Sequence, residues 1–298
     1  MSLHTLNKDC KAITIWQQNL NKSPSCQHSL ISSSRLVKHN IDIIALQEPS
    51  INFLKKTIAL QDWIPIYPMT HDKQPNKTRA VMLIRGDILT ENWEQIDFPS
   101  SDVTAICIRE KWGTLHIFNI YNDCEHNDTL NVLMEYHRKH EQDIAGTEDT
   151  HQEHHLLWLG DFNWHHPYWD NLKDNRLFTH EACSMAEVLL RKVADLGMDL
   201  ALPKGILTHR HHVTKKWTHL DQVFAMEHTM EAITTCNTLQ DEQGVNTDHV
   251  LVVTVMDMEL TKAPMQTARN FRDVDWSKFQ KTLEGKLNKL QMPAVTSW

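Results

Sequence analysis

Polar side chains stand at the ends of several apolar segments, where a β-strand would stop. Carboxylates, carboxamides and one imidazole gathered in this way could hold a hard divalent cation and a phosphate group. The set is Asn19 and Asn21 after ITIWQQ, Glu48 after IIALQ, Tyr121 closing HIFNIY, Asp161 and Asn163 after LLWLG, Asp221 within WTHLDQVF, and Asp248 and His249 before VLVVTV.

The residue types indicate which ion such a site would bind. Oxygen ligands from Glu48 and the aspartates favour Mg²⁺, with Mn²⁺ as an alternative, and asparagine would orient water and phosphate oxygens. Taken singly, an asparagine or a Gly-Asp-Phe-Asn segment at a strand end is commonly a simple turn. Asp221 lies in an apolar strand, where a buried carboxylate needs a partner. The order and spacing of the whole set favour a site.

Strands and helices in a mixed order must position these residues. Four- to nine-residue apolar runs predict strands, and amphipathic patterns predict three helices between them. The strand ranges are 12–16, 41–46, 80–84, 103–108, 114–121, 155–159, 217–225 and 249–256, and the helical ranges are 27–39, 128–143 and 180–196. Because 80–121 contains successive strands without helices, we expect an α/β sandwich with antiparallel pairs rather than a Rossmann sheet or a barrel.

The chain changes character after Met256. Residues 258–298 are read as a polar linker followed by an amphipathic helix, in which Trp276, Phe279, Leu283 and Leu287 recur at helical spacing. We therefore expect a first domain over 1–257 and a second segment, 258–298, that needs a partner surface.

Composition limits the classes of protein that fit. The 298 residues are 41% hydrophobic, enough for a core, and 30 basic against 38 acidic side chains leave a net charge of −8. That excess of acid argues against broad adhesion to polyphosphate or anionic lipid. Scattered cysteines, no signal-peptide pattern and no long apolar run predict a soluble, intracellular protein without a membrane partner. A monomer is expected.

The motif series resembles the endonuclease/exonuclease/phosphatase superfamily. Its elements here are Asn19-Leu-Asn21, Leu-Gln-Glu48-Pro, Tyr121, Gly-Asp161-Phe-Asn163, Leu-Asp221 and Thr247-Asp248-His249. WQQNLNKS, ALQEPSI and LLWLGDFNWHHPYWD are similar to the apurinic-type endonuclease domains of non-LTR (LINE-like) retrotransposons. The resemblance implies a DNase I-like fold, a four-layer αββα sandwich of two mixed sheets flanked by helices. It also implies DNA as partner, a nuclear location, and a reverse transcriptase following in a longer parent polypeptide.

The resemblance also implies a role for each matching residue. Glu48 would be the principal metal ligand, with Asn19 and Asp248 close to the metal. Asp161 would activate the attacking water or protonate the leaving oxygen. Asn163 and Tyr121 would contact the phosphate. His249, oriented by Asp221, would stabilise the pentacovalent phosphorus. The usual Ser-Asp-His is Thr247-Asp248-His249 here, which keeps the hydroxyl.

Two histidine-rich stretches suggest other chemistry. His151, His154, His155, His165 and His166 could indicate zinc, but no acid or thiolate stands at a zincin spacing and neighbours in a strand face opposite ways. The segment LTHRHHVTKKWTHLD predicts a basic hairpin. Its tip is either simply solvated or contacts the DNA backbone. Weaker substrate contacts are expected from Asn21, Thr208, Arg210, Lys215 and Lys216.

Three functions remain in order of preference. The first is a Mg²⁺-dependent DNA endonuclease that nicks target DNA to leave a 3′-hydroxyl for retrotransposon integration. The second is a phosphatase or phosphodiesterase for a smaller phosphoester. The third is a catalytically silent nucleic-acid-binding relic. Trp164 and Trp169 are expected to pack in the core rather than to stack on bases.

Overall fold

A computed structural model describes residues 12–58, 60–145, 152–242, 244–263 and 275–287 of the chain. The chain divides into two compact units, Met1–Ala263 and Pro264–Trp298. Each is described separately.

The first unit contains one mixed six-stranded sheet formed by both ends of its sequence. Only β1 and β2 run parallel, and the other neighbours are antiparallel. In spatial order its strands are β13 (Ile233–Leu239), β14 (Leu251–Met256), β1 (Ile13–Asn19), β2 (Ile43–Gln47), β4 (Ala80–Arg85) and β3 (Trp63–Ile66).

The second six-stranded sheet is built from the middle of the sequence. Here β7 and β8 form the parallel pair. Its order is β5 (Trp93–Ile96), β6 (Val103–Glu110), β7 (Gly113–Tyr121), β8 (Glu153–Asp161), β12 (Asp221–Met226) and β9 (Met198–Leu200). A separate hairpin joins β10 (His209–Arg210) to β11 (Trp217–Thr218).

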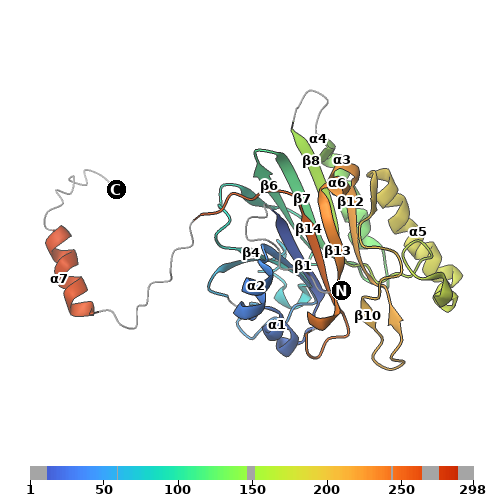
Figure 1. The fold of residues 1–298 in the computed structure, drawn as a ribbon, viewed down its shortest axis with the longest axis horizontal. Helices are drawn as coiled ribbons and strands as arrows, with labels where there is room; N and C mark the ends of the chain where they lie inside the picture. The colour runs from blue at the N-terminus through green and yellow to red at the C-terminus, as the bar shows by residue number, and fades with distance from the viewer. Residues whose placement is uncertain (1–11, 59, 146–151, 243, 264–274, 288–298) are drawn as a thin grey trace. The chain divides into compact units, whose positions relative to one another are not determined.

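Three apolar clusters correspond to the interfaces between four layers. The central cluster contains Ile15 of β1 and Leu157 of β8, so the two sheets pack face to face. Trp16, one residue along β1, points to the other side and packs with Leu30. On the outer face of the second sheet, Trp158 lies in a cluster with helical residues. This alternation follows from the two-residue period of a strand. The predicted αββα sandwich is confirmed (Figure 1).

Helices and short 3₁₀ turns occupy the outer layers and the connections (Figure 1). Their bounds are α1 (Pro24–Leu30), α2 (Ser33–His39), α3 (Asp128–Lys139), α4 (Glu141–Ala145), α5 (His180–Asp195), α6 (Glu227–Ala232), η1 (Pro75–Lys77), η2 (Leu172–Leu177) and η3 (Gln240–Glu242). None of the helices in the described ranges combines the length and apolar character needed to cross a bilayer.

Three predicted elements are interrupted in the structure. The helix predicted over 27–39 is two helices. α1 begins at Pro24, where Ser23 caps it by accepting the Cys26 N–H at 3.1 Å, and ends at Leu30, and a new helix begins at residue 33. The helix predicted over 128–143 is broken at His140 into α3 and α4. The strand predicted over 217–225 is divided into β11 and β12, so that Asp221 opens β12 rather than lying inside a strand.

The second unit contains one described helix, α7 (Trp276–Leu287). Its four large apolar side chains, Trp276, Phe279, Leu283 and Leu287, are between 43% and 57% exposed. The first unit extends to Ala263, whose N–H donates to Asp87 O at 2.7 Å, a few residues past the expected boundary at 257.

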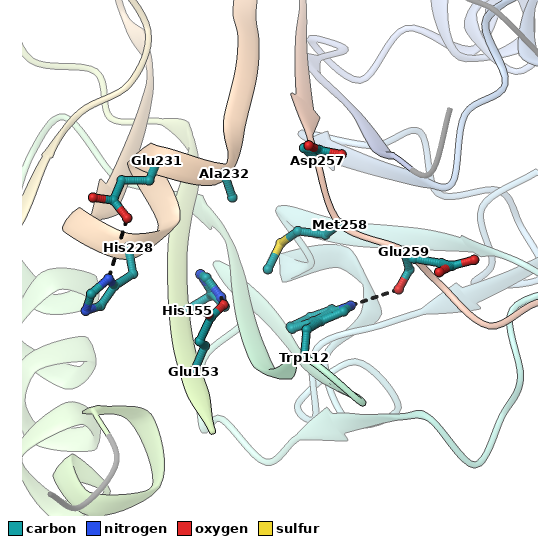
Figure 2. Close-up of a pocket in the computed structure, with 9 residues that line it drawn as sticks. All are labelled: Trp112, Glu153, His155, His228, Glu231, Ala232, Asp257, Met258 and Glu259. Atoms are coloured by element: carbon teal, nitrogen blue, oxygen red, sulfur yellow. Dashed lines mark hydrogen bonds and ion pairs between the residues drawn. The ribbon is translucent and has the colours of Figure 1, made fainter. Parts of the chain in front are cut away.

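A pocket of about 380 Å³ lies at the start of β8 (Figure 2). Trp112 forms one wall and donates its indole N–H to Glu259 O at 2.8 Å, and Glu153 and His155 lie on the strand beside it. Since β8 is nine residues long, this pocket is roughly 25 Å from Asp161 at the other end of the strand. It is therefore separate from the residues considered next.

Candidate active site

The parallel strand pairs bring the predicted residues to one edge of the sandwich. Because β1 and β2 run parallel, Asn19 is paired with Gln47, and Glu48 follows directly. In the other sheet, Tyr121 at the end of β7 is paired with Asp161 at the end of β8. The two sheets are joined nearby, where Gln17 donates to Gly160 O at 2.9 Å.

Asp161 is a buried carboxyl group at the centre of this edge. It is 1% exposed, and its Oδ2 accepts the Asn19 amide at 2.8 Å while its Oδ1 accepts the Asn163 N–H at 3.1 Å. Burial raises the pKa of Asp161 to about 7, with Asp221 adding to the effect and His249 opposing it. A carboxyl group with this pKa can take up or release a proton near neutrality.

His249 and Asp221 form a buried pair beside that carboxyl group. His249 Nδ1 lies 2.9 Å from Asp221 Oδ2, and His249 Nε2 lies 3.9 Å from Asp161 Oδ2. Although burial alone lowers the pKa of His249, Asp221, Asp161 and Asp248 raise it to about 9. The ring is therefore a cationic hydrogen-bond donor at neutral pH, suited to stabilising negative charge.

Asp221 is held in place by Thr208. The Thr208 hydroxyl accepts the N–H groups of Leu220 and Asp221, each at 3.1 Å, and the side chain is fully buried. Thr208 thus lies beneath the predicted substrate surface and supports Asp221.

Glu48 and Asp248 provide an oxygen-rich margin to the site. Glu48 Oε1 lies 3.4 Å from Lys22 Nζ, and Asp248 Oδ1 accepts the Asn21 amide at 3.4 Å, so both carboxylates contact the turn after β1. A hydrogen bond from His209, followed by the charge of His249, lowers the pKa of Asp248 to about 2 despite burial. Carboxylate and amide oxygens are the donor set that Mg²⁺ or Mn²⁺ prefers. The donor types at this edge fit a hard divalent cation. Among the described residues, ligand atoms lie within 4.8 Å of one another in Asp161, Asp221 and His249 and in His209, Asp248 and His249, and Glu48 belongs to neither group.

Backbone strain is concentrated at this edge. Eight non-glycine residues among those described have positive φ, and four of them, Asn21, Lys22, Glu48 and Asn163, belong to the site or contact it. Such conformations cost about 1–3 kcal/mol each and persist where the surroundings hold them. Glu48, for example, has φ of 43° and is held by Arg79 O, which accepts its N–H at 2.8 Å.

Gly160 is required by the close approach of β7 and β8. Its φ is 151°, and a Cβ added there would lie 2.7 Å from the carbonyl carbon of Ile120 and nearer still to the oxygen. Any larger residue would push apart the two strands that carry Tyr121 and Asp161.

Arg79 is a residue of this edge that sequence reasoning missed. Its guanidinium donates two parallel hydrogen bonds to Asp102, both at 2.8 Å, and lies 4.6 Å from the centre of the Tyr121 ring. Burial, together with Glu48 and Asp161, raises the pKa of Tyr121. The phenol therefore stays a neutral donor, and Arg79 fixes its ring. No motif marks Arg79, because it meets Tyr121 only where the two sheets pack: Arg79 directly precedes β4 of the first sheet, and Tyr121 ends β7 of the second.

Asn163 faces the same edge from the turn after β8. Its amide donates to Asn122 O at 2.9 Å, and Asn122 N–H donates to Asp161 O at 2.8 Å. The two asparagines thus support the loop that carries Asp161. Trp164 and Trp169, which follow, are buried as predicted.

The basic hairpin borders a cleft beside the site. The cleft has a volume of about 340 Å³ and includes Asn163, Arg176, His209 and Lys216 in its lining. Lys215 and Lys216 are exposed at the hairpin, and Arg210 lies 5.7 Å from the Trp217 ring. His209, missed as a site residue, lies with its Nε2 3.5 Å from Asp248 Oδ2.

The histidines of the zinc-like run are not brought together. His155 lies at the start of β8 against Glu153, whereas His165 lies beyond the end of that strand, 3.2 Å from Asp170. His151 is outside the described residues.

Comparison with known proteins identifies the fold. No family model matches the chain, and no curated protein matches its sequence significantly. Among solved structures, it is similar to the endonuclease domain of TRAS1, a telomere-specific non-LTR retrotransposon (15% identity, TM-score 0.61, 84% of this chain and 100% of that one). It is also similar to the AP endonuclease LMAP of Leishmania major (10% identity, TM-score 0.65, 85% of this chain and 89% of that one). A third similar structure is the 3′ phosphatase NExo of Neisseria, bound to a product DNA hairpin (17% identity, TM-score 0.56, 81% of this chain and 98% of that one). The fold expected from the motif resemblance is confirmed.

Proposed function

We propose that this chain is a divalent-metal-dependent phosphodiesterase of the endonuclease/exonuclease/phosphatase superfamily that nicks DNA and leaves a 3′-hydroxyl. One observation carries the proposal: a buried carboxyl group, Asp161, and a buried imidazolium, His249, converge beside the carboxylates of Asp221 and Asp248. The fold is shared with structures named as AP endonucleases, a retrotransposon endonuclease and a 3′ phosphatase. That likeness supports the reaction class but does not assign it.

Each residue has a part in hydrolysis. Glu48 and Asp248 would hold the Mg²⁺ ion, whose charge would offset that of the scissile phosphate. Asp161 would take the proton of the attacking water or protonate the leaving oxygen. His249 and Tyr121 would donate hydrogen bonds to non-bridging oxygens as charge develops there.

Asn19 fits a positioning role better than that of a metal ligand. Its Nδ2 donates to Asp161 at 2.8 Å and its Oδ1 accepts the Asn21 N–H at 2.8 Å. With both ends of the amide engaged, we assign Asn19 to orient Asp161. Asn163 would contact the phosphate, while Arg210, Lys215 and Lys216 would contact the DNA backbone.

The proposed biological role follows from the resemblance. The domain would act in the nucleus as a monomer, nicking a target so that a reverse transcriptase of the same parent polypeptide can extend the 3′-hydroxyl. In this proposal α7 lies in the segment leading to that enzyme.

A plasmid-nicking assay tests the reaction. Purified chain should convert supercoiled plasmid to open circle with Mg²⁺ or Mn²⁺ and not with EDTA, and a polymerase should extend the nick without end repair. Asp161→Ala and His249→Ala should abolish nicking, while Asp257→Ala, an exposed carboxylate of the pocket in Figure 2, should not. Nicking that survives both site substitutions would refute the proposal. Faster hydrolysis of small phosphoesters would favour a phosphatase, and no hydrolysis at all would favour a silent binding domain.

A further inference from the structure

Two imidazoles and a carboxylate meet where the hairpin touches the active site. His209 Nε2 lies 3.5 Å from Asp248 Oδ2, and His249 Nε2 lies 4.0 Å from Asp248 Oδ1. The two rings are 4.7 Å apart between centres, and one ligand atom from each of the three residues lies within 4.8 Å of the others. This cluster shares Asp248 with the oxygen-rich margin but differs from it in its other ligands, because it includes His209 and His249 and lacks Glu48.

Backbone hydrogen bonds fix the three residues relative to one another. Arg210 N–H donates to Asp248 O at 2.7 Å, and Val250 N–H donates to Thr208 O at 2.7 Å. These two bonds join the base of the hairpin to the strand segment that carries His249. The cluster therefore does not depend on the chance approach of a mobile loop.

Each imidazole ring is oriented by a hydrogen bond at Nδ1, the nitrogen that would not bind the metal. His249 Nδ1 lies 2.9 Å from Asp221 Oδ2, and His209 Nδ1 lies 3.0 Å from Thr218 Oγ1. Both rings consequently direct Nε2 towards Asp248. Histidines that bind metal characteristically hold their second nitrogen in this way, with a carboxylate or another polar group fixing the ring.

The donor set selects a different ion from that of the oxygen-rich margin. Two imidazole nitrogens and one carboxylate oxygen, with a fourth position open, suit Zn²⁺, whereas Mg²⁺ prefers oxygen alone. Bonds of about 2.0–2.1 Å in a tetrahedron separate ligand atoms by about 3.4 Å. The observed 3.5 and 4.0 Å run to the two different oxygens of Asp248, and one ligand atom from each residue lies within 4.8 Å of the others, so rotamer adjustments of up to about 1.4 Å would complete the site.

We propose that His209, Asp248 and His249 form a Zn²⁺-binding site and that Zn²⁺ bound there inhibits the enzyme. Inhibition follows because the ion would occupy the imidazole and the carboxylate that hydrolysis requires, and this part rests on the proposed function. The existence of the zinc site does not rest on the proposed function.

The binding test uses the full chain without a histidine tag. Isothermal titration with Zn²⁺, and the visible absorption of Co²⁺ as a spectroscopic substitute, should detect one site per chain that His209→Phe removes. The Phe ring keeps the tilted ring contact with His249 but offers no ligand, so the affinity for Zn²⁺ at that site should fall by more than about 100-fold, since even outer partners of metal ligands contribute about 10–100-fold. His211→Phe, on the same hairpin and exposed, is the matched control and should bind as the parent does.

A second variant and a second assay complete the test. His209→Gln keeps a donor for Asp248, and thermal melting verifies that each variant is folded. In nicking assays at saturating Mg²⁺, with each variant normalised to its own zinc-free rate, half-inhibition of His209→Phe should require at least about 100-fold more Zn²⁺ than that of the parent or His211→Phe. Equal zinc binding by parent and His209 variants overturns the site. Zinc binding that needs His209 but leaves nicking unchanged overturns the inhibition. Binding through His209 in a chain that never nicks DNA upholds the site and refutes the proposed function.

Discussion

Replacing Gly160 by alanine should damage the site through the fold. A Cβ at this position would lie 2.7 Å from the carbonyl carbon of Ile120 and 2.9 Å from its nitrogen. Carbon atoms in contact normally stay about 3.5 Å or more apart, so β7 and β8 would have to separate by at least about 0.8 Å, and by more to clear the Ile120 oxygen, which lies nearer still. Their spacing in a ladder is only about 4.8 Å, and hydrogen bonds on both sides of Asp161 would lengthen.

The expected cost has two parts. A φ of 151° lies in a region that L-residues rarely adopt, which costs about 1–3 kcal/mol. Overpacking against the backbone adds about 1–3 kcal/mol. A total of about 4 kcal/mol would lower the Tm by roughly 8–16 °C, taking 2–4 °C per kcal/mol for a domain of this size.

Gly197→Ala provides the matched control. Gly197 also has positive φ, 61°, but nothing lies within 4 Å of the added Cβ. The Gly197→Ala variant should lose only about 1–2 kcal/mol of its free energy of unfolding, because alanine is disfavoured in the left-handed conformation. Calorimetry and nicking below both transitions should show Gly160→Ala less stable and nearly inactive, and Gly197→Ala active. Equal Tm losses for the two variants, or full activity of Gly160→Ala, would refute the reasoning.

Three further changes test separate parts of the molecule. Asp221→Asn should lower kcat about 10- to 150-fold, because it weakens a charge-assisted hydrogen bond to His249 that contributes about 1.5–3 kcal/mol. The Mg²⁺ concentration that gives half-maximal nicking should not change, and single-turnover nicking assays measure both quantities. The double change Lys215→Gln and Lys216→Gln removes two phosphate contacts. It should flatten by about 1.8 the slope of the logarithm of the DNA association constant against the logarithm of the salt concentration, as measured by fluorescence anisotropy. Although burial opposes it, hydrogen bonds from basic side chains of α2 lower the pKa of Glu242 from 4.5 to about 2. These ion pairs therefore stabilise the fold fully above pH 4.5 and lose their effect as the pH falls through about 2. Glu242→Gln should cost about 1–2 kcal/mol in urea unfolding at pH 7 and less than half of that near pH 3.

The parts of the fold predicted best are those buried on both faces. β1, β7 and β8 read as continuous apolar runs, because each packs between two layers, and their ends were located to within a few residues. By contrast, β13 was not predicted. It lies at the edge of its sheet and has only one buried residue, Cys236, in a polar sequence. Edge strands carry little periodic signal, since solvent replaces one of their neighbours.

The site shows the same division between local and distant information. Asp161 and Asn163 could be recognised because a carboxylate and an amide directly follow a buried strand. Arg79 and His209 could not, since their roles depend on contacts between segments far apart in sequence. Arg79 meets Tyr121 across 42 residues, and His209 meets His249 across 40, through an antiparallel bridge that no motif records. The resemblance supplied roles only for positions that the family's motifs contain.

The charges at the site indicate why a cation and the chemistry should depend on each other. Asp161, Asp221 and His249 are all at least 95% buried, and together they place two carboxyl groups around one imidazolium. With both acids ionised, the trio would carry one uncompensated negative charge in a medium of low dielectric constant, and burial accordingly raises the pKa of Asp161 to about 7. A cation held by Glu48 and Asp248 would lower that pKa and produce the carboxylate that can accept a proton from water. The same cation would offset the negative charge of the phosphate, which the carboxylates of the oxygen-rich margin would otherwise repel. A chain with a net charge of −8 would therefore bind DNA productively only when the ion is present, and its affinity for cleavable DNA should rise with Mg²⁺ even where the lysines of the hairpin are intact.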